Sequence, residues 1–328
     1  MVRASSAACA ALLLVGCANC PKIQARAGAG APAPSGLAAS ATVAKDGAPH
    51  PIVRRQNYRM ESGPIAVEVE PDGGRILEFS LAGRSVIVPV DESPDAYASS
   101  FWPSPQSDWK WPPPPEFDKL PWKAAIEGKA LRLRSATCES LHFSAEQRIT
   151  LLEGKNAMLV EFTITNHDSA PHKVAPWQNT RVRPKGITFY PSTEPTYPQS
   201  SLKLTPTNGI SWYTHDPTTV KDNLKSYADG REGWMAEVDG DLLFVKVFTD
   251  VPRESQAPEE GEIVIYVSNG GRFVEMEQQG AYTALLPGAS LTWPVVFAVQ
   301  RIPKNVEIKA ESARLVELAR QLAASVRQ

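Results

Sequence analysis

Apolar and polar residues alternate along many short segments of this chain, which is the pattern of strands with one buried face. Segments 64–70 and 75–80 alternate in this way and flank Asp72-Gly73-Gly74, so they predict a β-hairpin. Further alternating or β-rich runs lie at residues 130–134, 141–152, 158–166, 173–176, 241–249, 262–268, 273–278 and 291–300. Because no helical pattern separates these runs, the sequence predicts a mainly β protein built as an antiparallel sandwich.

Near the end of the chain, apolar residues recur at a different spacing. Ile308, Leu315, Leu318, Leu322 and Val326 recur at helical spacing among Ala, Glu, Arg and Gln. They predict an amphipathic C-terminal α-helix within residues 304–328 that packs on the sandwich, and a partner-binding helix is the alternative.

Residues 101–122 contain four Trp and seven Pro. Proline fixes φ and removes a backbone donor, so this composition predicts a stiff, extended loop with neither a helix nor a central strand. Indole rings on such a loop suit the stacking of a sugar ring, or the packing of a lid onto the core.

The N-terminal sequence predicts an export signal. Arg3 and an apolar run over residues 7–15 have signal-peptide proportions, and Leu14-Val15-Gly16-Cys17 resembles the bacterial lipobox. By that resemblance residues 1–16 are a lipoprotein signal peptide and Cys17 is the acylated N-terminus; an ordinary secretory signal cut elsewhere is the alternative. Ala18 after the cysteine favours the outer membrane.

Residues 17–50 are rich in Ala, Gly, Pro and Ser and predict a disordered tether. A single domain then fills residues 52–303. Cys138 is the one cysteine in that region, so no disulfide framework is expected there. The net charge of −2 and the lack of a basic run argue against nucleic-acid binding.

The order of several short motifs resembles a family. The motifs are Asp72-Gly73-Gly74-Arg75-Ile76, Trp102-Pro103-Ser104-Pro105-Gln106, the run 160–166, Ala175-Pro176-Trp177, the run 273–277 and Leu286-Pro287-Gly288. Over residues 58–302 the chain is similar to a family of uncharacterised bacterial domains in the galactose-mutarotase-like (aldose-1-epimerase-like) superfamily. That resemblance implies a large antiparallel β-supersandwich with a shallow groove for sugars.

Mutarotases use a Glu as general base and a His as general acid, with a second His in support, so the resemblance implies candidates for both roles. Glu275 falls where the family's Glu-bearing strand would lie, and Glu277 would share its face of the strand. Both could equally face solvent or form a like-charge pair or a cation site. His215, in an aromatic and polar loop, is the candidate acid. The Asn166-His167 dipeptide lacks the aromatic residues that continue the mutarotase signature.

Motifs of other reaction classes are absent from the sequence: it has no Gly-x-Ser-x-Gly elbow, phosphate loop, dinucleotide fingerprint or His-Glu-x-x-His. No cofactor and no metal are therefore predicted.

Two functional hypotheses follow. In the favoured one, the protein is a lipid-anchored, non-catalytic carbohydrate-binding protein of the cell envelope; in the other, it is an aldose 1-epimerase with Glu275 as base. The stacking candidates are Trp102, Trp109, Trp111, Trp177 and Trp212, and the candidates for bonds to hydroxyls are Gln106, Asp108, Gln178, Asn179, Arg181 and Glu277. Trp102 and Trp177 could instead be core or lid residues.

Overall fold

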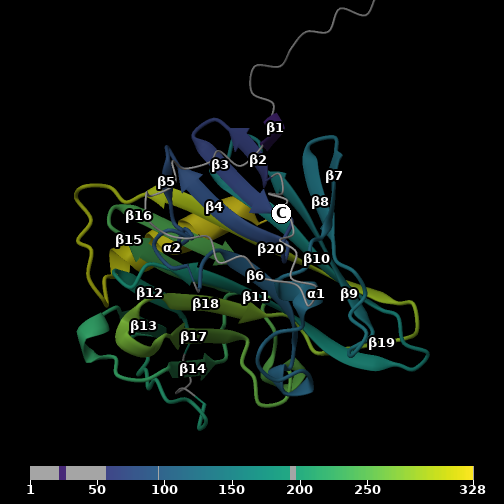
Figure 1. Cartoon of the computed structure of the whole chain (residues 1–328). Coiled ribbons are helices and arrows are strands. Elements are labelled where there is room, and N and C mark those ends of the chain that lie inside the picture. Colours follow the sequence, from purple (N-terminus) through teal and green to yellow (C-terminus); the bar gives the residue numbers. More distant parts are fainter. Residues whose placement is uncertain (1–21, 27–56, 95, 193–196, 328) are drawn as a thin grey trace, which may run out of the picture.

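The computed structural model describes residues 22–26, 57–94, 96–192 and 197–327 (Figure 1). Within these residues two antiparallel β-sheets of eleven and nine strands pack face to face. The mainly β sandwich predicted from the alternating pattern is confirmed.

The larger sheet has the strand order β1-β2-β3-β4-β6-β11-β18-β17-β14, with β5 paired to β4 and β19 paired to β11. Its strands are β1 (Lys22–Arg26), β2 (Asn57–Ser62), β3 (Ile65–Glu70), β4 (Arg75–Leu81), β5 (Arg84–Ser85), β6 (Ser99–Ser104), β11 (His172–Val182), β14 (Leu224–Ala228), β17 (Ile263–Val267), β18 (Val274–Gln279) and β19 (Thr283–Leu285).

The smaller sheet has the order β13-β12-β15-β16-β20-β10-β9-β8-β7. Its strands are β7 (Lys123–Glu127), β8 (Ala130–Arg134), β9 (Phe143–Leu151), β10 (Ala157–Asn166), β12 (Ile187–Pro191), β13 (Ile210–Thr214), β15 (Trp234–Asp239), β16 (Leu242–Val247) and β20 (Ser290–Arg301). Four 3-10 turns lie in the loops that the structure describes: η1 (Gln106–Asp108), η2 (Pro217–Thr219), η3 (Arg253–Ser255) and η4 (Asn269–Gly271).

The main hydrophobic core fills the space between the two sheets. Phe79 of β4 meets Phe244 and Phe297 of the smaller sheet at ring-centroid distances of 6.0 and 6.1 Å. All three rings are fully buried, and burial of this kind contributes roughly 2–3 kcal/mol for each large apolar side chain. The same alternation that buries one face of each strand presents the next residue on the other face.

The hairpin predicted around Asp72-Gly73-Gly74 is confirmed, because β3 and β4 pair across this turn. Gly73 has φ +70°, and a Cβ there would lie 2.3 Å from the carbonyl oxygen of Asp118. Glycine therefore lets the hairpin turn approach the Trp- and Pro-rich segment closely.

The prediction that the Trp- and Pro-rich segment holds no central strand is wrong. Its first residues form β6, which lies between β4 and β11 in the larger sheet. Pro103 sits directly opposite Pro176 of β11. Two residues without N–H groups can only form a non-hydrogen-bonded pair, and on its other side β6 meets β4 only at Ser99. No ladder bond is therefore lost at Pro103.

The same segment also contains a short helix, α1 (Pro115–Asp118), so the prediction that it holds no helix is wrong as well. Pro115 occupies its first turn, where the missing N–H has no intrahelical acceptor to lose.

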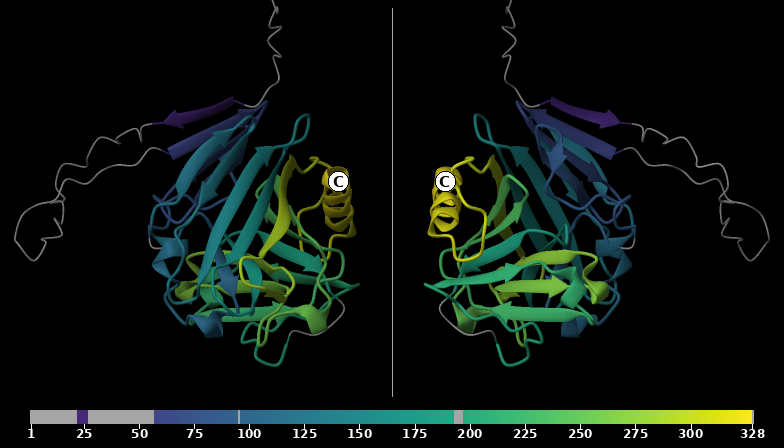
Figure 2. Two further views of the ribbon diagram at one scale, coloured as in Figure 1. Left: turned by 90° about the vertical axis from the view of Figure 1, so that its right-hand side faces the viewer. Right: turned by 90° about the vertical axis from the view of Figure 1, so that its left-hand side faces the viewer.

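The predicted C-terminal helix is α2 (Ala313–Val326), with Ser312 as its N-cap. Figure 2 shows α2 lying against the outer face of the smaller sheet. Leu315, Leu318 and Val326 are buried there, whereas Ile308 precedes the helix and is 43% exposed. The apolar stripe thus covers the sheet, as predicted, except for Ile308.

The predicted signal peptide and Cys17 lie outside the described residues. Inside the predicted tether, the structure places β1, which pairs antiparallel with the edge strand β2. The segment was expected to be a spacer without strands, but Lys22-Ile23-Gln24-Ala25-Arg26 alternates polar and apolar residues and can extend an open edge. Among the described residues no helix is long and apolar enough to cross a membrane.

Candidate functional site

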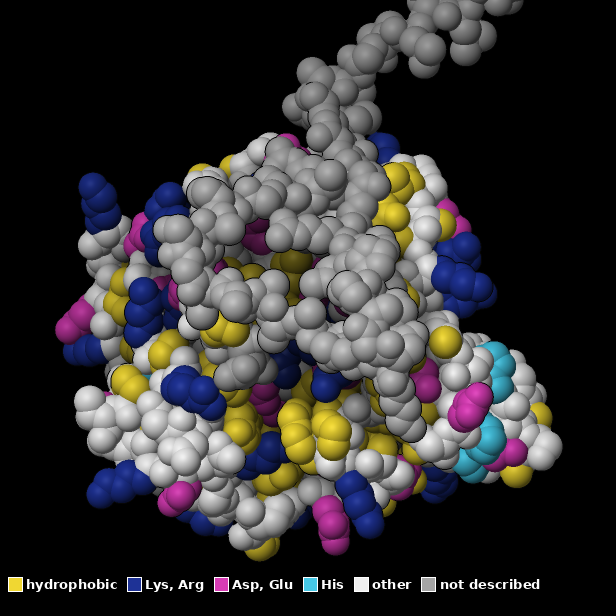
Figure 3. Space-filling view, viewed as in Figure 1, with side chains coloured by type: hydrophobic (Ala, Val, Ile, Leu, Met, Phe, Trp, Pro, Cys, Tyr) yellow, Lys and Arg dark blue, Asp and Glu magenta, His cyan; other side chains and the backbone are white. Residues whose placement is uncertain are grey.

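A cavity of about 540 Å³ opens on the face of the larger sheet that points away from the smaller sheet. We call it the aromatic cavity. Figure 3 shows hydrophobic, basic and acidic side chains side by side on this face of the molecule. Its lining residues are Ala96, Trp102, Gln106, Trp111, Trp177, Arg181, Asn223, Lys225, Tyr227, Tyr266, Arg272, Phe273, Glu275 and Glu277.

Strand register brings the charged groups of the cavity together. Lys225 of β14 lies opposite Tyr266 of β17. Tyr266 in turn lies opposite Glu275 of β18, and Glu275 lies opposite Arg181 of β11. These four residues form one row across four adjacent strands. Their side chains share a face because directly paired residues in an antiparallel sheet point to the same side.

A second row lies two residues along each strand. Tyr227 belongs to it on β14, Glu277 on β18 and Asn179 on β11. The face shared by Glu275 and Glu277, predicted from their spacing, is confirmed because both line the cavity.

Indole rings form one wall of the aromatic cavity. Trp102 of β6 is paired with Trp177 of β11, and their ring centroids lie 5.3 Å apart at 82°. Both are only 2% exposed, so most of their surface packs against protein. Trp111 meets Trp102 edge to face at 6.2 Å and is 68% exposed. Trp111 therefore offers an open apolar face at the rim.

Lys225 occupies the opposite side of the cavity among aromatic rings. Its ammonium lies 5.4 Å from the Trp177 ring centroid, 5.6 Å from that of Tyr227 and 6.0 Å from that of Tyr266. Burial acts to lower the pKa of Lys225, but the charge of Glu277 and weaker neighbouring charges outweigh it and raise the pKa above its usual value. The side chain is thus a fixed cation in the cavity.

Glu277 is the most deeply buried acid of the cavity. Burial raises the pKa of its carboxyl group to about 8, although the Lys225 charge acts to lower it. Trp177 donates a hydrogen bond from Nε1 to Oε2 of Glu277 at 2.9 Å. Glu275 lies in an ion pair with Arg181, whose Nε is 2.9 Å from Oε1. The cavity therefore presents both hydrogen-bond donors and acceptors near its aromatic wall.

Beneath the cavity floor several polar atoms have no hydrogen-bond partner among the described residues. They include both side-chain polar atoms of Asn179 and Oε1 of Glu277, which are fully buried neighbours on β11 and β18. Unpaired buried polar groups are costly, and they recur at functional sites or beside ordered water.

Seven of the predicted site residues line this cavity: Trp102, Gln106, Trp111, Trp177, Arg181, Glu275 and Glu277. Trp109 does not line it but supports it, because its ring lies 6.0 Å from that of Trp177. Asn179 lies under it, as described. Gln178 points the other way, between the sheets, where its Oε1 accepts a hydrogen bond from Gln278 Nε2 at 2.7 Å.

The structure does not bring His215 to Glu275. His215 is buried beside the smaller sheet, where Nε2 lies 2.8 Å from Oγ1 of Thr188, which also donates to Glu237. Burial lowers the pKa of His215 to about 4, so the ring is neutral near neutral pH. The aromatic loop context suggested a groove residue, but these contacts are those of a buried structural histidine.

Two further predicted residues lie away from the cavity lining. Trp212 of β13 stacks on Phe189 with centroids 4.6 Å apart, beside a small hollow that α2 also lines. Asp108 is exposed on η1. Partial burial raises its pKa, and the nearby charge of His172 opposes the shift.

Sequence reasoning missed the contribution of β14 and β17. Lys225, Tyr227 and Tyr266 line the cavity, with Asn223, Arg272 and Phe273 near its edge. The alternation in Leu224-Lys225-Ser226-Tyr227-Ala228 is a short strand signal that could have revealed part of this set. Among the described residues no cluster of three or more His, Cys, Asp or Glu could hold a metal ion.

A family model described as "Domain of unknown function (DUF4380)" matches residues 103–300. The chain belongs to this DUF4380 family. The matched region begins in β6 and ends in β20, so it includes most of the strands that build the aromatic cavity. No curated protein matches the chain.

Solved structures show that the DUF4380 protein has a galactose mutarotase-like fold. The Slr1438 protein from Synechocystis sp. PCC 6803 is 14% identical with a TM-score of 0.55, over 75% of this chain and 96% of that one. A galactose mutarotase-like protein from Lactobacillus casei is 10% identical with a TM-score of 0.54, over 74% and 100%. Another from Clostridium acetobutylicum is 13% identical with a TM-score of 0.53, over 75% and 96%.

Proposed function

We propose that this protein is a non-catalytic carbohydrate-binding protein of the bacterial cell envelope that holds its ligand in the aromatic cavity. The observation that carries the proposal is the combination of an exposed indole, Trp111, with fixed polar groups in a cavity of about 540 Å³. Sugar-binding sites need flat apolar faces for the ring and both donors and acceptors for the hydroxyls.

The fold supports this proposal because solved proteins of the same fold are described as galactose mutarotase-like. The cavity also supplies the required chemistry: Lys225 and Arg181 donate hydrogen bonds, and Glu275 accepts them. Glu277, with its pKa near 8, would donate or accept according to pH.

Export and anchoring form the other part of the proposal. We infer that residues 1–16 direct export and that Cys17 carries lipid, with the outer membrane as destination. The support is the order of the basic residue, the apolar run and the Leu-Val-Gly-Cys tetrapeptide. Multiple acyl chains on one residue give stable anchoring.

Tryptophan fluorescence tests binding directly, because several indoles border the cavity. Titration of the purified protein with a panel of glycans should give a saturable change for at least one of them. Trp111→Ala should weaken that binding by about fivefold, since an aromatic contact is worth about 1 kcal/mol. Leu286→Ala is the control, because Leu286 is 64% exposed and does not line the cavity. A flat response across the panel would refute the proposed function.

One observation favours an enzymatic alternative, an aldose 1-epimerase with Glu275 as base. Glu275 and Glu277 line the same cavity, and a carboxyl group with a pKa of about 8 can carry a proton near neutral pH. In that case Glu277, rather than His215, would supply the acid. Polarimetry with fresh α-hexoses decides: acceleration that is lost in Glu275→Gln supports the enzyme, and a rate equal to that of buffer excludes it for those sugars.

A further inference from the structure

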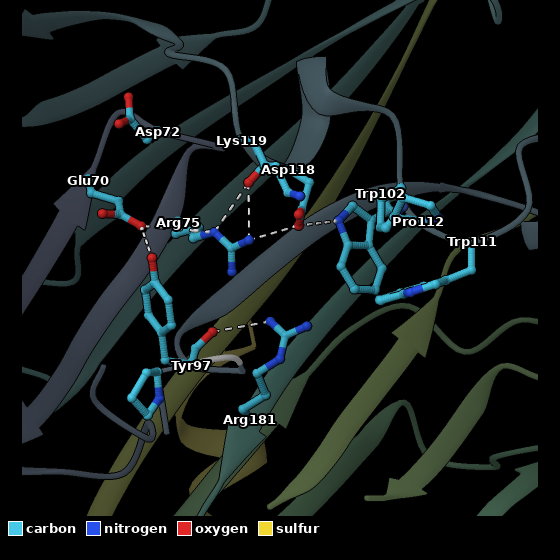
Figure 4. A pocket seen from close by; sticks show the side chains of 12 residues that line it. Glu70, Asp72, Arg75, Tyr97, Trp102, Trp111, Pro112, Asp118, Lys119 and Arg181 are labelled. Carbon is cyan, nitrogen blue, oxygen red and sulfur yellow. Dashed lines mark hydrogen bonds and ion pairs between the residues drawn. The ribbon is translucent and has the colours of Figure 1, made fainter. Parts of the chain in front are cut away.

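A second cavity of about 430 Å³ adjoins the aromatic cavity. We call it the flanking cavity. It lies between the β3–β4 hairpin and α1, and it shares Trp102, Trp111 and Arg181 with the aromatic cavity. Figure 4 shows Arg75, Arg181 and Trp102 turned toward the same space.

The polar wall of the flanking cavity is held in place by its own contacts. Arg75 Nη2 lies 2.9 Å from Oδ1 of Asp118, and the guanidinium lies 5.1 Å from the ring centroid of Tyr97. Tyr97 in turn donates a hydrogen bond to Glu70 Oε1 at 3.1 Å. Side chains fixed in this way lose little freedom when a ligand binds, which favours affinity.

Trp102 and Arg181 form the boundary between the two cavities and make contacts on both sides. Trp102 donates from Nε1 to Asp118 in the flanking cavity and packs on Trp177 in the aromatic cavity. Arg181 pairs through Nε with Glu275 on one side and donates from Nη1 to the carbonyl oxygen of Tyr97 on the other. Because Trp111 lines both cavities and is 68% exposed, its ring lies at the junction.

The charges of the flanking cavity are balanced. Three cationic side chains face three acidic ones: Arg75, Lys119 and Arg181 with Glu70, Asp72 and Asp118. Such a mixed wall offers donors and acceptors without a strong net potential, which suits neutral hydroxyl groups better than a polyanion.

We propose that the two cavities are adjacent subsites of one groove for a neutral oligosaccharide. One sugar residue occupies the aromatic cavity, the next occupies the flanking cavity, and Trp111 stacks at their junction. Each cavity is of a size that holds one small-molecule unit. The inference rests on the proposed function and adds to it the class and minimum length of the ligand.

Chain-length dependence of binding tests the inference. The purified protein is titrated by calorimetry with malto-, cello-, xylo- and chito-oligosaccharides, from the monosaccharide to the hexasaccharide. In the series that binds, affinity should rise by about tenfold or more from the monosaccharide to the disaccharide. Lys119→Ala should cut this gain by about threefold or more, with the monosaccharide affinity unchanged, since Lys119 lines only the flanking cavity.

Lys123→Ala is the matched control, because Lys123 is an exposed lysine on β7 that lines neither cavity. Equal affinity for the monosaccharide and longer chains, or an undiminished gain in Lys119→Ala, would overturn the two-subsite groove and leave the proposed function standing. Absence of binding in every series would overturn both.

Discussion

At the scale of single residues, the site depends on partners that are distant in the chain. Lys225 is tolerated in a partly buried position because the charge of Glu277 and three aromatic rings lie close to its ammonium group. His215 shows the opposite outcome: burial keeps its ring neutral near neutral pH, and its contact with Thr188 holds it away from the cavity.

His215 gives a prediction for stability against pH. Its pKa is about 4 in the folded protein and about 6.5 when unfolded, so its contribution to the free energy of unfolding is complete above pH 6.5 and declines toward pH 4. The loss amounts to about 3 kcal/mol at most. His215→Gln removes this titration, so its unfolding free energy should fall less steeply than that of the wild type across this range.

Urea denaturation at several pH values measures this difference. His167→Gln is the control, because His167 is an exposed histidine whose ring contacts Ser144. It should keep the pH dependence of the wild type. An unchanged slope in His215→Gln would mean that His215 is not held neutral by burial.

At the scale of elements, the alternation of apolar and polar residues was sufficient to predict most strands. It failed where a strand contains proline or is short. The hairpin β3–β4, the long strands β9, β10 and β20, and the shorter strand β18 follow from period-two patterns. β6 was missed because its Pro103 is acceptable only at a non-hydrogen-bonded position, here opposite Pro176 and beyond the pairing with β4, and this is a property of the strand pairing rather than of the segment. The residues of the candidate site differ in the same way. The shared face of Glu275 and Glu277 could be predicted from their spacing within one strand, whereas the position of Lys225 and Tyr266 in the site depends on the register between strands.

Helix α2 yields a prediction about packing. Leu315 is fully buried against the smaller sheet, so Leu315→Ala should lower the free energy of unfolding by about 2–4 kcal/mol. Ile308→Ala is the control and should cost less than about 0.5 kcal/mol, because Ile308 lies before the helix and is exposed. Chemical denaturation compares the two variants. Equal losses would show that the helix does not depend on its buried stripe.

At the scale of the whole molecule, the outer faces of the two sheets carry different features. Helix α2 lies against the outer face of the smaller sheet (Figure 2). Both cavities are lined by residues of the larger sheet and its loops. A ligand in the cavities would therefore meet strands β6, β11, β18, β17 and β14, together with the β3–β4 hairpin and α1 beside the flanking cavity. Helix α2 would serve stability.

The proposed anchor gives a prediction for the protein in its cell. Cys17→Ser should move the protein from the membrane fraction to the soluble envelope fraction and abolish labelling with a radioactive fatty acid. Cys20→Ser, three positions on in the sequence, is the matched control and should change neither result. Continued lipid labelling of Cys17→Ser would contradict the assignment.

Calorimetric titration of the best-binding glycan into the wild type and two lysine variants tests the central claim most directly. Lys225→Met removes the cation in the aromatic cavity. Lys173→Met is the matched control, because the Lys173 ammonium also lies over an aromatic ring, 5.6 Å from the centroid of Tyr282, but does not line the cavity. We expect a measurable affinity for the wild type, a loss of about tenfold or more in Lys225→Met and no change in Lys173→Met. No binding by the wild type, or equal affinities for the wild type and Lys225→Met, would contradict the account.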